Sequence, residues 1–326
     1  MSNQPETSQQ AGQHPLSSDT GTSDRPTSRF VETLGHRRFT EFCDACRRYR
    51  YIGLCYGAPG VGKTLSARSY SRWEAVRDTD PCSEPSIEGP ALATVFYTPP
   101  VVNTPRTISS EIERARDRLN LFARRPVRLE KEERLEFIRR RDMEHQARML
   151  YKHDWLQEPI PQLQPTYGDV ATEYALKEAH IPDPTSLILV DEADRLRMAS
   201  LEQVRAIFDE GQLGLILIGM PGLEKRLARY PQFYSRIGFV HEFRPLGTTE
   251  IRQLLEQRWT PTDVNLPVQP WAEDAVAAII RITGGNFRLL NRLLTQMERI
   301  LEINSLQQVT KAVVEAARES LVIGQS

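Results

Sequence analysis

The octapeptide GAPGVGKT at residues 57–64 constrains the fold of this chain more than any other feature. It matches the pattern G-x-x-x-x-G-K-[ST], in which glycines let backbone N–H groups converge on phosphate oxygens while the following helix adds a favourable partial charge. An apolar run, YIGLCY (51–56), precedes it, and a helical pattern over 65–77 follows it. This order predicts a nucleotide-binding loop on an α/β sheet.

The loop residues have expected roles in binding ATP and Mg²⁺. Lys63 should reach the β- and γ-phosphates, and Thr64 should ligate Mg²⁺. The predicted nucleotide-binding residues of the loop are Gly57, Ala58, Pro59, Gly60, Val61, Gly62, Lys63, Thr64 and Leu65.

A second motif, LILVDEADRL (187–196), supplies the acidic partners that such a loop needs. Its four apolar residues predict a buried strand that ends in Asp191 and Glu192. Asp191 should also bind the nucleotide through Mg²⁺, and Glu192 should polarise an attacking water molecule. The pair favours ATP hydrolysis over the alternative of two solvated acids at a strand end.

Further apolar runs predict the rest of a parallel sheet, namely ATVFYT (93–98), LGLILIG (213–219) and FVHEF (239–243). Continuous apolar strands that alternate with helices are typical of a sheet covered on both faces. The expected fold class is therefore α/β, a P-loop parallel sheet flanked by helices.

The chain divides into three parts. Residues 1–28 are rich in Ser, Thr, Gln and Pro and are expected to be disordered. Residues 29–245 should form the nucleotide-binding domain. From Leu246 no strand is evident, and 246–326 should form an all-α lid domain with helices at 248–259, 271–283, 286–302 and 306–321.

An unusually long connection, at about 101–180, separates the second and third strands. Residues 101–152 contain 14 Lys and Arg against 9 Asp and Glu, a net charge of +5. Such a segment can contact nucleic-acid phosphates, but interleaved charges also describe a solvated, salt-bridged helix pair. Both interpretations stay open.

Four blocks carry a resemblance to a known family: GAPGVGKT, ILVDEADRL, LILIGMPGLEKRLARYPQFYSRIGFVHEFRPL and TGGNFRLLNRLL. In this order they resemble the AAA+ ATPases of DNA transposition, the TnsC/TniB/MuB group, which is related to the ExeA-type ATPases. The resemblance implies that Arg236 completes the catalytic site of a neighbouring subunit and that Arg288 senses the nucleotide from the lid. Arg226 and Arg229 compete with Arg236 for the first role.

The resemblance also implies a function. Members of the group assemble on double-stranded DNA, without sequence preference, as ATP-bound rings or filaments, select a target site and recruit or activate a transposase. Their DNA contacts follow the second strand, which makes the candidate DNA-binding residues Arg106, Arg114, Arg118, Arg124 and Arg125. One departure is that Gly219 and Met220 stand where the group often has a polar sensor.

Other classes remain as alternatives. They are an ExeA-type or other protein-directed ATPase switch without DNA binding, a NACHT- or STAND-like signalling switch, and a small-molecule kinase. The Asp191–Glu192 pair and the helical C-terminal part argue against the kinase. The formal net charge of −1 confines any DNA binding to a local patch.

The remaining features indicate a cytoplasmic protein. No apolar run approaches the ~20 residues that cross a bilayer, and the first residues lack the basic and apolar regions of a secretory signal. The motif C-x-x-C at Cys43 and Cys46 has no second pair of ligands nearby, so we expect ordinary reduced thiols.

Overall fold

The computed structural model describes most of the chain: residues 30–83, 89–152, 162–257, 259–261, 264–267 and 271–321. The expected disordered tail at 1–28 lies outside these residues. No described helix is long and apolar enough to cross a membrane.

Five parallel strands form one sheet in the order β2-β3-β4-β1-β5. The strands are β1 (Ile52–Tyr56), β2 (Thr94–Tyr97), β3 (Leu187–Val190), β4 (Gly214–Gly219) and β5 (Ile237–Glu242). Since parallel strands leave their carboxyl ends at the same edge, the loops that follow β1, β3 and β4 meet there. This confirms the predicted fold class.

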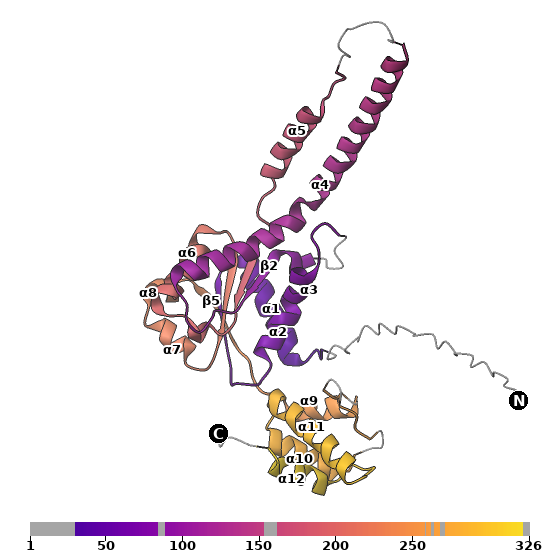
Figure 1. The fold of residues 1–326 in the computed structure, drawn as a ribbon. Coiled ribbons are helices and arrows are strands. Elements are labelled where there is room, and N and C mark those ends of the chain that lie inside the picture. Colours follow the sequence, from indigo (N-terminus) through magenta and orange to yellow (C-terminus); the bar gives the residue numbers. More distant parts are fainter. Residues whose placement is uncertain are drawn as a thin grey trace, which may run out of the picture.

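Helices cover both faces of the sheet, which explains the unbroken apolar strands (Figure 1). Successive side chains of a strand enter different cores: Leu54 belongs to one cluster and Cys55 to the other, and Ile188 and Leu189 divide in the same way. One face packs against α1 (Leu34–Tyr49). The other helices of this part are α2 (Lys63–Ser71), α3 (Trp73–Asp78), α6 (Met198–Glu210), α7 (Leu223–Ala228), α8 (Pro231–Tyr234), η1 (Gly89–Ala93) and η2 (Ala193–Arg195).

The helix predicted over 65–77 is two helices. It breaks at Arg72, whose φ of 46° is left-handed and ends α2 before α3 begins. The local apolar spacing continues across this break, so the sequence pattern did not reveal it.

The long connection contains α4 (Pro105–Lys152) and α5 (Tyr167–Ala179), which form a projecting hairpin (Figure 1). Its first part is not an appendage, because Ile108, Ile112, Leu119 and Phe122 are buried in the main core. Pro126 lies inside α4, just beyond these residues, where a proline removes one backbone hydrogen bond. Beyond it, a separate small cluster of Ile138, Val170 and Tyr174 holds the two helices together.

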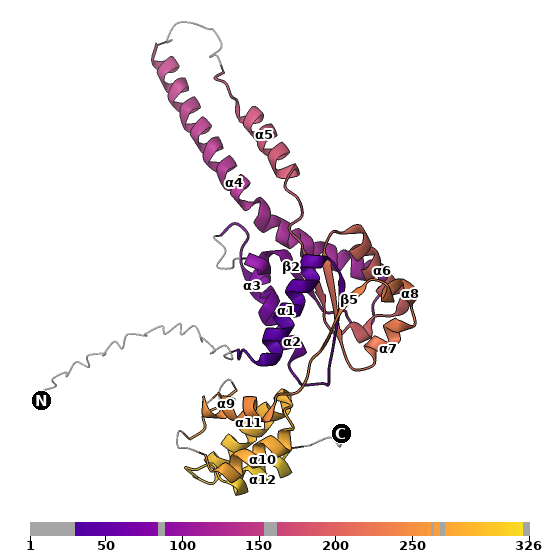
Figure 2. The ribbon, with the colours of Figure 1, turned by 180° about the vertical axis from the view of Figure 1, so that it is seen from behind.

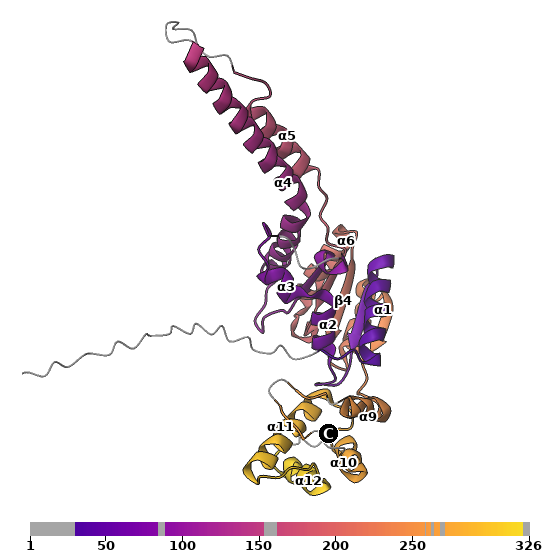
Figure 3. The same cartoon turned by 90° about the vertical axis from the view of Figure 1, so that its right-hand side faces the viewer.

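The C-terminal part is helical and has its own core, as expected from residue 246 onward. Its helices are α9 (Thr248–Glu256), α10 (Glu273–Thr283), α11 (Phe287–Ile303) and α12 (Lys311–Glu319). Figures 2 and 3 show this lid beneath the sheet, at the end of the molecule opposite the hairpin.

Candidate functional site

The loop after β1 has the shape needed to approach a phosphate. Gly60 and Gly62 have φ values of 81° and 111°, a region that residues with a Cβ rarely adopt. A Cβ at Gly57 would collide with the Phe243 carbonyl oxygen. α2 begins at Lys63 directly after the loop, so its first free N–H groups face the same space.

Lys63 crosses this loop. Its Nζ atom donates to the carbonyl oxygens of Gly57, at 2.6 Å, and Ala58, at 2.9 Å. Burial lowers the pKa of this lysine, an effect that the nearby Asp191 and Asp194 carboxylates oppose. The ammonium group is thus held at the loop with neutral oxygen partners that an anionic phosphate could replace.

Asp191 and Glu192 lie at the carboxyl end of β3. Asp191 is buried, receives a hydrogen bond from Thr64 and accepts the Glu192 N–H at 2.9 Å. Burial is the main cause that raises the pKa of Asp191. Mg²⁺ prefers oxygen ligands such as hydroxyl and carboxylate groups. The Thr64 hydroxyl lies beside the Asp191 carboxylate, and no cationic side chain among the described residues is hydrogen-bonded to that carboxylate. Thr64 and Asp191 therefore fit this ion.

Glu192 has a left-handed backbone, with φ at 51°, and its carboxylate pairs with the Arg195 guanidinium. Arg195 also donates to the carbonyl oxygen of Pro99, at 3.3 Å, in the segment after β2. Asn103 from the same segment donates to the Arg195 carbonyl oxygen at 3.0 Å. The expected catalytic glutamate is therefore linked through Arg195 to the loop after β2.

Asp194 is a site residue that the sequence interpretation missed. Its Oδ2 atom accepts the Met220 N–H at 2.7 Å, which brings a carboxylate to the end of β4. Gly219 and Met220 provide no polar side chain at the end of β4, and the Asp194 carboxylate from another segment occupies this position. The available signal was the third acid of the DEAD sequence, two residues after Glu192.

These groups surround one cavity of about 490 Å³. A second cavity of about 320 Å³ shares Gly62, Leu65, Phe287 and Asn291 with it and has a more apolar lining. A charged cavity joined to an apolar one suits a nucleotide, whose phosphates and base need different surroundings. The first is lined by Pro59, Gly60, Gly62, Lys63, Thr64, Leu65, Asp191, Glu192, Asp194, Gly219, Met220, Phe287, Arg288 and Asn291.

The lid closes this cavity through the first turn of α11. Asn286 donates to the Pro59 carbonyl oxygen at 2.9 Å, and the Arg288 N–H donates to that of Gly60 at 3.0 Å. The Arg288 side chain lines the cavity and makes no hydrogen bond or ion pair within the described part of the chain. The structure therefore brings Arg288 together with the loop that sequence reasoning paired with it.

Comparison with known proteins decides the family. A family model described as an AAA domain matches residues 46–227, which include both motifs and the loop after β2. The chain belongs to this AAA family. A potential ATP-binding protein of Staphylococcus aureus is 39% identical to it over 303 residues, 90% of this chain and 97% of that protein.

Two further likenesses are more distant. The Mu-like prophage FluMu DNA transposition protein B of Haemophilus influenzae is 29% identical over 112 residues, 32% of this chain and 37% of that protein. A solved structure of a Thermotoga maritima RuvB mutant has a TM-score of 0.51 at 14% identity and covers 92% of this chain and 74% of its own. The RuvB likeness supports the fold alone.

Arg236 of this AAA protein lies outside its own nucleotide cavity. It stands before β5, where its Nε atom pairs with Asp209 Oδ1 of α6 at 2.6 Å. Of its two competitors, Arg226 donates to the Asp194 and Leu196 carbonyl oxygens. Arg229 is exposed and makes no side-chain hydrogen bond or ion pair with any described residue.

The five candidate DNA-binding arginines of α4 differ in their surroundings. Arg118 is engaged inside the protein, because it donates to the carbonyl oxygens of Val76, Arg77 and Thr79 at the end of α3. Arg125 donates to the Cys82 carbonyl oxygen at 3.3 Å, and the Arg124 Nε atom is buried. Arg106 and Arg114 are exposed and have no side-chain hydrogen bond or ion pair within the described residues.

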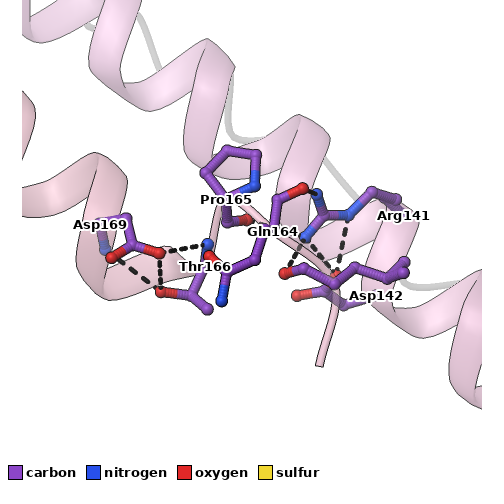
Figure 4. A network of polar contacts seen from close by, with 7 residues as sticks. Arg141, Asp142, Gln164, Pro165, Thr166 and Asp169 are labelled. Carbon is purple, nitrogen blue, oxygen red and sulfur yellow. Dashed lines mark hydrogen bonds and ion pairs between the residues drawn. The ribbon is translucent and has the colours of Figure 1, made fainter. Parts of the chain in front are cut away.

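The outer hairpin has the salt-bridged character that the charge pattern allowed. Tyr174 donates to Glu130 at 2.7 Å, and Glu178 pairs with Arg128 and Lys131, each at 3.9 Å. Arg141 holds the segment before α5 by donating to the carbonyl oxygens of Leu163, Gln164 and Pro165, of which Figure 4 labels the last two.

The cysteines of the C-x-x-C motif belong to the core. Cys43 and Cys46 are buried on α1 against the sheet, and burial raises the pKa of Cys46 to about 12. Among the described residues, no three His, Cys, Asp or Glu side chains gather in a way that could hold a metal.

Proposed function

We propose that this AAA protein hydrolyses ATP. Glu192 accepts a proton from the water that attacks the γ-phosphorus, the bond between the β- and γ-phosphates breaks, and ADP and phosphate leave. Lys63 and the N–H groups of the loop bind the phosphates. Thr64 and Asp191 would hold Mg²⁺, which would neutralise charge on the phosphates. The observation that carries this proposal is the convergence of all four side chains on one cavity with a lid arginine.

A single subunit provides an incomplete site in this proposal. Developing charge on a transferred phosphoryl group needs cationic stabilisation, and arginine fingers supply it in many such enzymes. Arg236 lies outside its own cavity but is one-third exposed at its side chain. We assign it to the cavity of a neighbouring copy, so the active form is a homo-oligomer.

The proposed biological role is an ATP-dependent, DNA-binding regulator of transposition. The partial similarity to a phage-type DNA transposition protein supports it, together with the order of the four sequence blocks. On this proposal ATP-bound oligomers coat double-stranded DNA without sequence preference and recruit or activate a transposase. Arg106 and Arg114 are the better candidates for phosphate contacts, since Arg118 and Arg125 already bind carbonyl oxygens.

The test measures binding to random-sequence duplex DNA with ATP, with ADP and without nucleotide, at several salt concentrations. Electron microscopy of the same samples reports assemblies. The double variant Arg106→Ala/Arg114→Ala should weaken binding and lower the slope of log affinity against log salt by about 2, because each phosphate contact contributes about 0.9. Arg116→Ala is the matched control, since Arg116 lies on the same helix but pairs with Asp183.

A protein-directed ATPase switch without DNA binding is the second candidate. Three large apolar side chains of the outer hairpin, Phe137, Met143 and Leu150, are 59%, 65% and 64% exposed, which favours a protein partner over DNA phosphates. Absence of DNA binding under every nucleotide condition would select this candidate and leave the proposed ATP hydrolysis intact.

A further inference from the structure

The nucleotide cavity holds a third carboxylate, Asp194, to which the sequence interpretation assigned no role. Asp194 lines the cavity together with Asp191 and Glu192, although it belongs to the short helix η2 after β3. Lys63 lines the same cavity. A carboxylate near bound phosphates is electrostatically unfavourable. Its presence at this cavity therefore calls for a role in the reaction or in the fold.

Two contacts hold Asp194, one to its carboxylate and one to its main chain. Asp194 Oδ2 accepts the Met220 N–H at 2.7 Å, and the Asp194 carbonyl oxygen accepts a hydrogen bond from Arg226 at 3.1 Å. Both partners come from the segment after β4, which is the neighbour of β3 in the sheet. Asp194 is therefore held by the segment that follows the neighbouring strand, and not by its own loop alone.

The end of β4 leaves the space that the carboxylate needs. A Cβ at Gly219 would lie 2.6 Å from Asp194 Oδ2 and 2.6 Å from Leu223 Cδ2, closer than such atoms can approach. A side chain on this strand end and the Asp194 carboxylate cannot both occupy this place. Gly219 gives the end of β4 no polar side chain, and the Asp194 carboxylate of η2 lies there instead.

The two oxygens of Asp194 have different surroundings. Oδ2 is anchored, whereas Oδ1 accepts no hydrogen bond from any residue that the structure describes. The residue is exposed toward the cavity. Asp194 lines the same cavity as Glu192, and a carboxylate that is anchored through one oxygen can accept a hydrogen bond from a water molecule through the other.

We propose that Asp194 is a positioning residue that orients the attacking water for Glu192. This inference rests on the proposed ATP hydrolysis. The Asp194 oxygen accepts one hydrogen bond from the water while the other proton passes to Glu192, so that the lone pair of the water oxygen faces the γ-phosphorus. The proton balance of the reaction is unchanged, because Asp194 keeps its charge throughout.

The test replaces Asp194 itself by asparagine. A substitution at Gly219 is less specific, because its side chain would meet Leu223 as well as Asp194. Asparagine keeps an oxygen for the Met220 N–H but turns its second acceptor into a donor. The matched control is Glu224→Gln: Glu224 accepts the Gly222 N–H at 2.8 Å in the same turn but does not line the cavity. Each variant is measured for kcat, KM, equilibrium binding of a fluorescent ATP analogue and melting temperature.

Asp194→Asn should lower kcat on the order of 100-fold, the cost of a misplaced reactant, with ATP affinity and melting temperature close to wild type. Glu224→Gln should keep wild-type kcat. Wild-type turnover in Asp194→Asn would overturn the role of Asp194 alone, and so would a loss of kcat that is matched by lost nucleotide binding or folding. Absence of ATP turnover in the wild-type protein would overturn the proposed hydrolysis, and the role of Asp194 with it.

Discussion

The Arg236 guanidinium lies against the Asp209 carboxylate, with 2.6 Å between Nε and Oδ1, and not in its own nucleotide cavity. Asp209 also pairs with Arg205, and Arg236 donates a further hydrogen bond to the Gln232 carbonyl oxygen. An ion pair with both side chains about one-third exposed is weak enough to exchange for a phosphate. This position is compatible with the proposed role of Arg236 at the cavity of a neighbouring subunit.

Arg236→Ala should therefore lower ATP turnover by about 10³-fold, while each subunit still binds ATP. Mixing Arg236→Ala subunits with Lys63→Ala subunits should restore part of the activity, because some interfaces then combine an intact loop with an intact arginine. The measurement is ATP turnover across mixing ratios. Arg205→Ala is the control, since Arg205 shares Asp209 but is not assigned to the neighbouring site. No recovery at any ratio would contradict action between subunits.

Glu192→Gln should bind ATP and fail to hydrolyse it. The amide is close in size to the carboxylate but cannot accept the proton of the attacking water. Turnover should fall by about 10²-fold or more, the usual contribution of a general base, with unchanged affinity for the nucleotide. Wild-type turnover in this variant would show that another group is the base.

Arg195→Ala should raise the ATP turnover of the protein on its own. The Arg195 guanidinium occupies the Glu192 carboxylate, so the glutamate must leave this pair before it can act on water. An exposed ion pair is worth up to about 1 kcal/mol, and its loss should increase turnover by up to about fivefold. Arg197→Ala is the control, since Arg197 is exposed nearby and does not contact Glu192. A fall in turnover would mean that Arg195 supports the active position of Glu192.

The sequence was sufficient to predict those parts of the site that directly follow a buried strand in the chain. The loop at 57–64 and the acids at 191–192 each follow a buried strand, and strand ends in a parallel sheet share one edge, so their convergence was predictable. The role of the lid arginine, Arg288, was expected through the resemblance and stays a prediction. Its contact with Gly60 depends on how the lid packs against the loop.

Other features depend on which segments become neighbours. Asp194 reaches Met220, 26 positions later in the chain, because β3 and β4 are adjacent, and the sequence between the two residues does not indicate this adjacency. Charge counts along α4 could not separate Arg118, which holds the end of α3, from Arg114, which is exposed. The same counts could not show that the first turns of α4 belong to the core, because their apolar residues are spaced among charged ones.

Asp191→Asn should stabilise the nucleotide-free protein at neutral pH. Burial raises the pKa of Asp191 above its ordinary value. A carboxyl group with a higher pKa in the folded state favours folding at low pH, and this contribution is lost as the pH rises through the folded pKa. The gain in melting temperature of the variant over wild type should therefore be larger at neutral pH than at a pH near 3.8, the ordinary pKa of an aspartate.

The control for this pH series is Glu113→Gln, an exposed carboxylate of α4 whose removal should shift the melting temperature little at either pH. Asp191→Asn should also lose the stabilisation that ATP with Mg²⁺ gives the wild-type protein, because binding of a ligand to the folded state alone raises stability. A melting temperature below wild type at both pH values would show that the charge of Asp191 supports the fold.

Asn286 should couple lid stability to nucleotide binding through two separable hydrogen bonds. Its Oδ1 atom accepts the Leu289 N–H at 3.1 Å and caps α11, while Nδ2 donates to the Pro59 carbonyl oxygen at 2.9 Å. Asn286→Ser keeps a helix-capping oxygen but cannot maintain the same donor at Pro59. It should weaken ATP binding by about fivefold, the value of one hydrogen bond of about 1 kcal/mol, at near wild-type stability.

Asn286→Ala should lose about 1 kcal/mol of stability in addition, because the cap is removed as well. Thr310→Ala provides the converse control: Thr310 caps α12 through the Val313 N–H, but it does not line the nucleotide cavity. That variant should melt earlier and bind ATP as wild type does. If Asn286→Ser and Thr310→Ala had the same effect on ATP binding, the lid would act through its overall stability and not through the contact with Pro59.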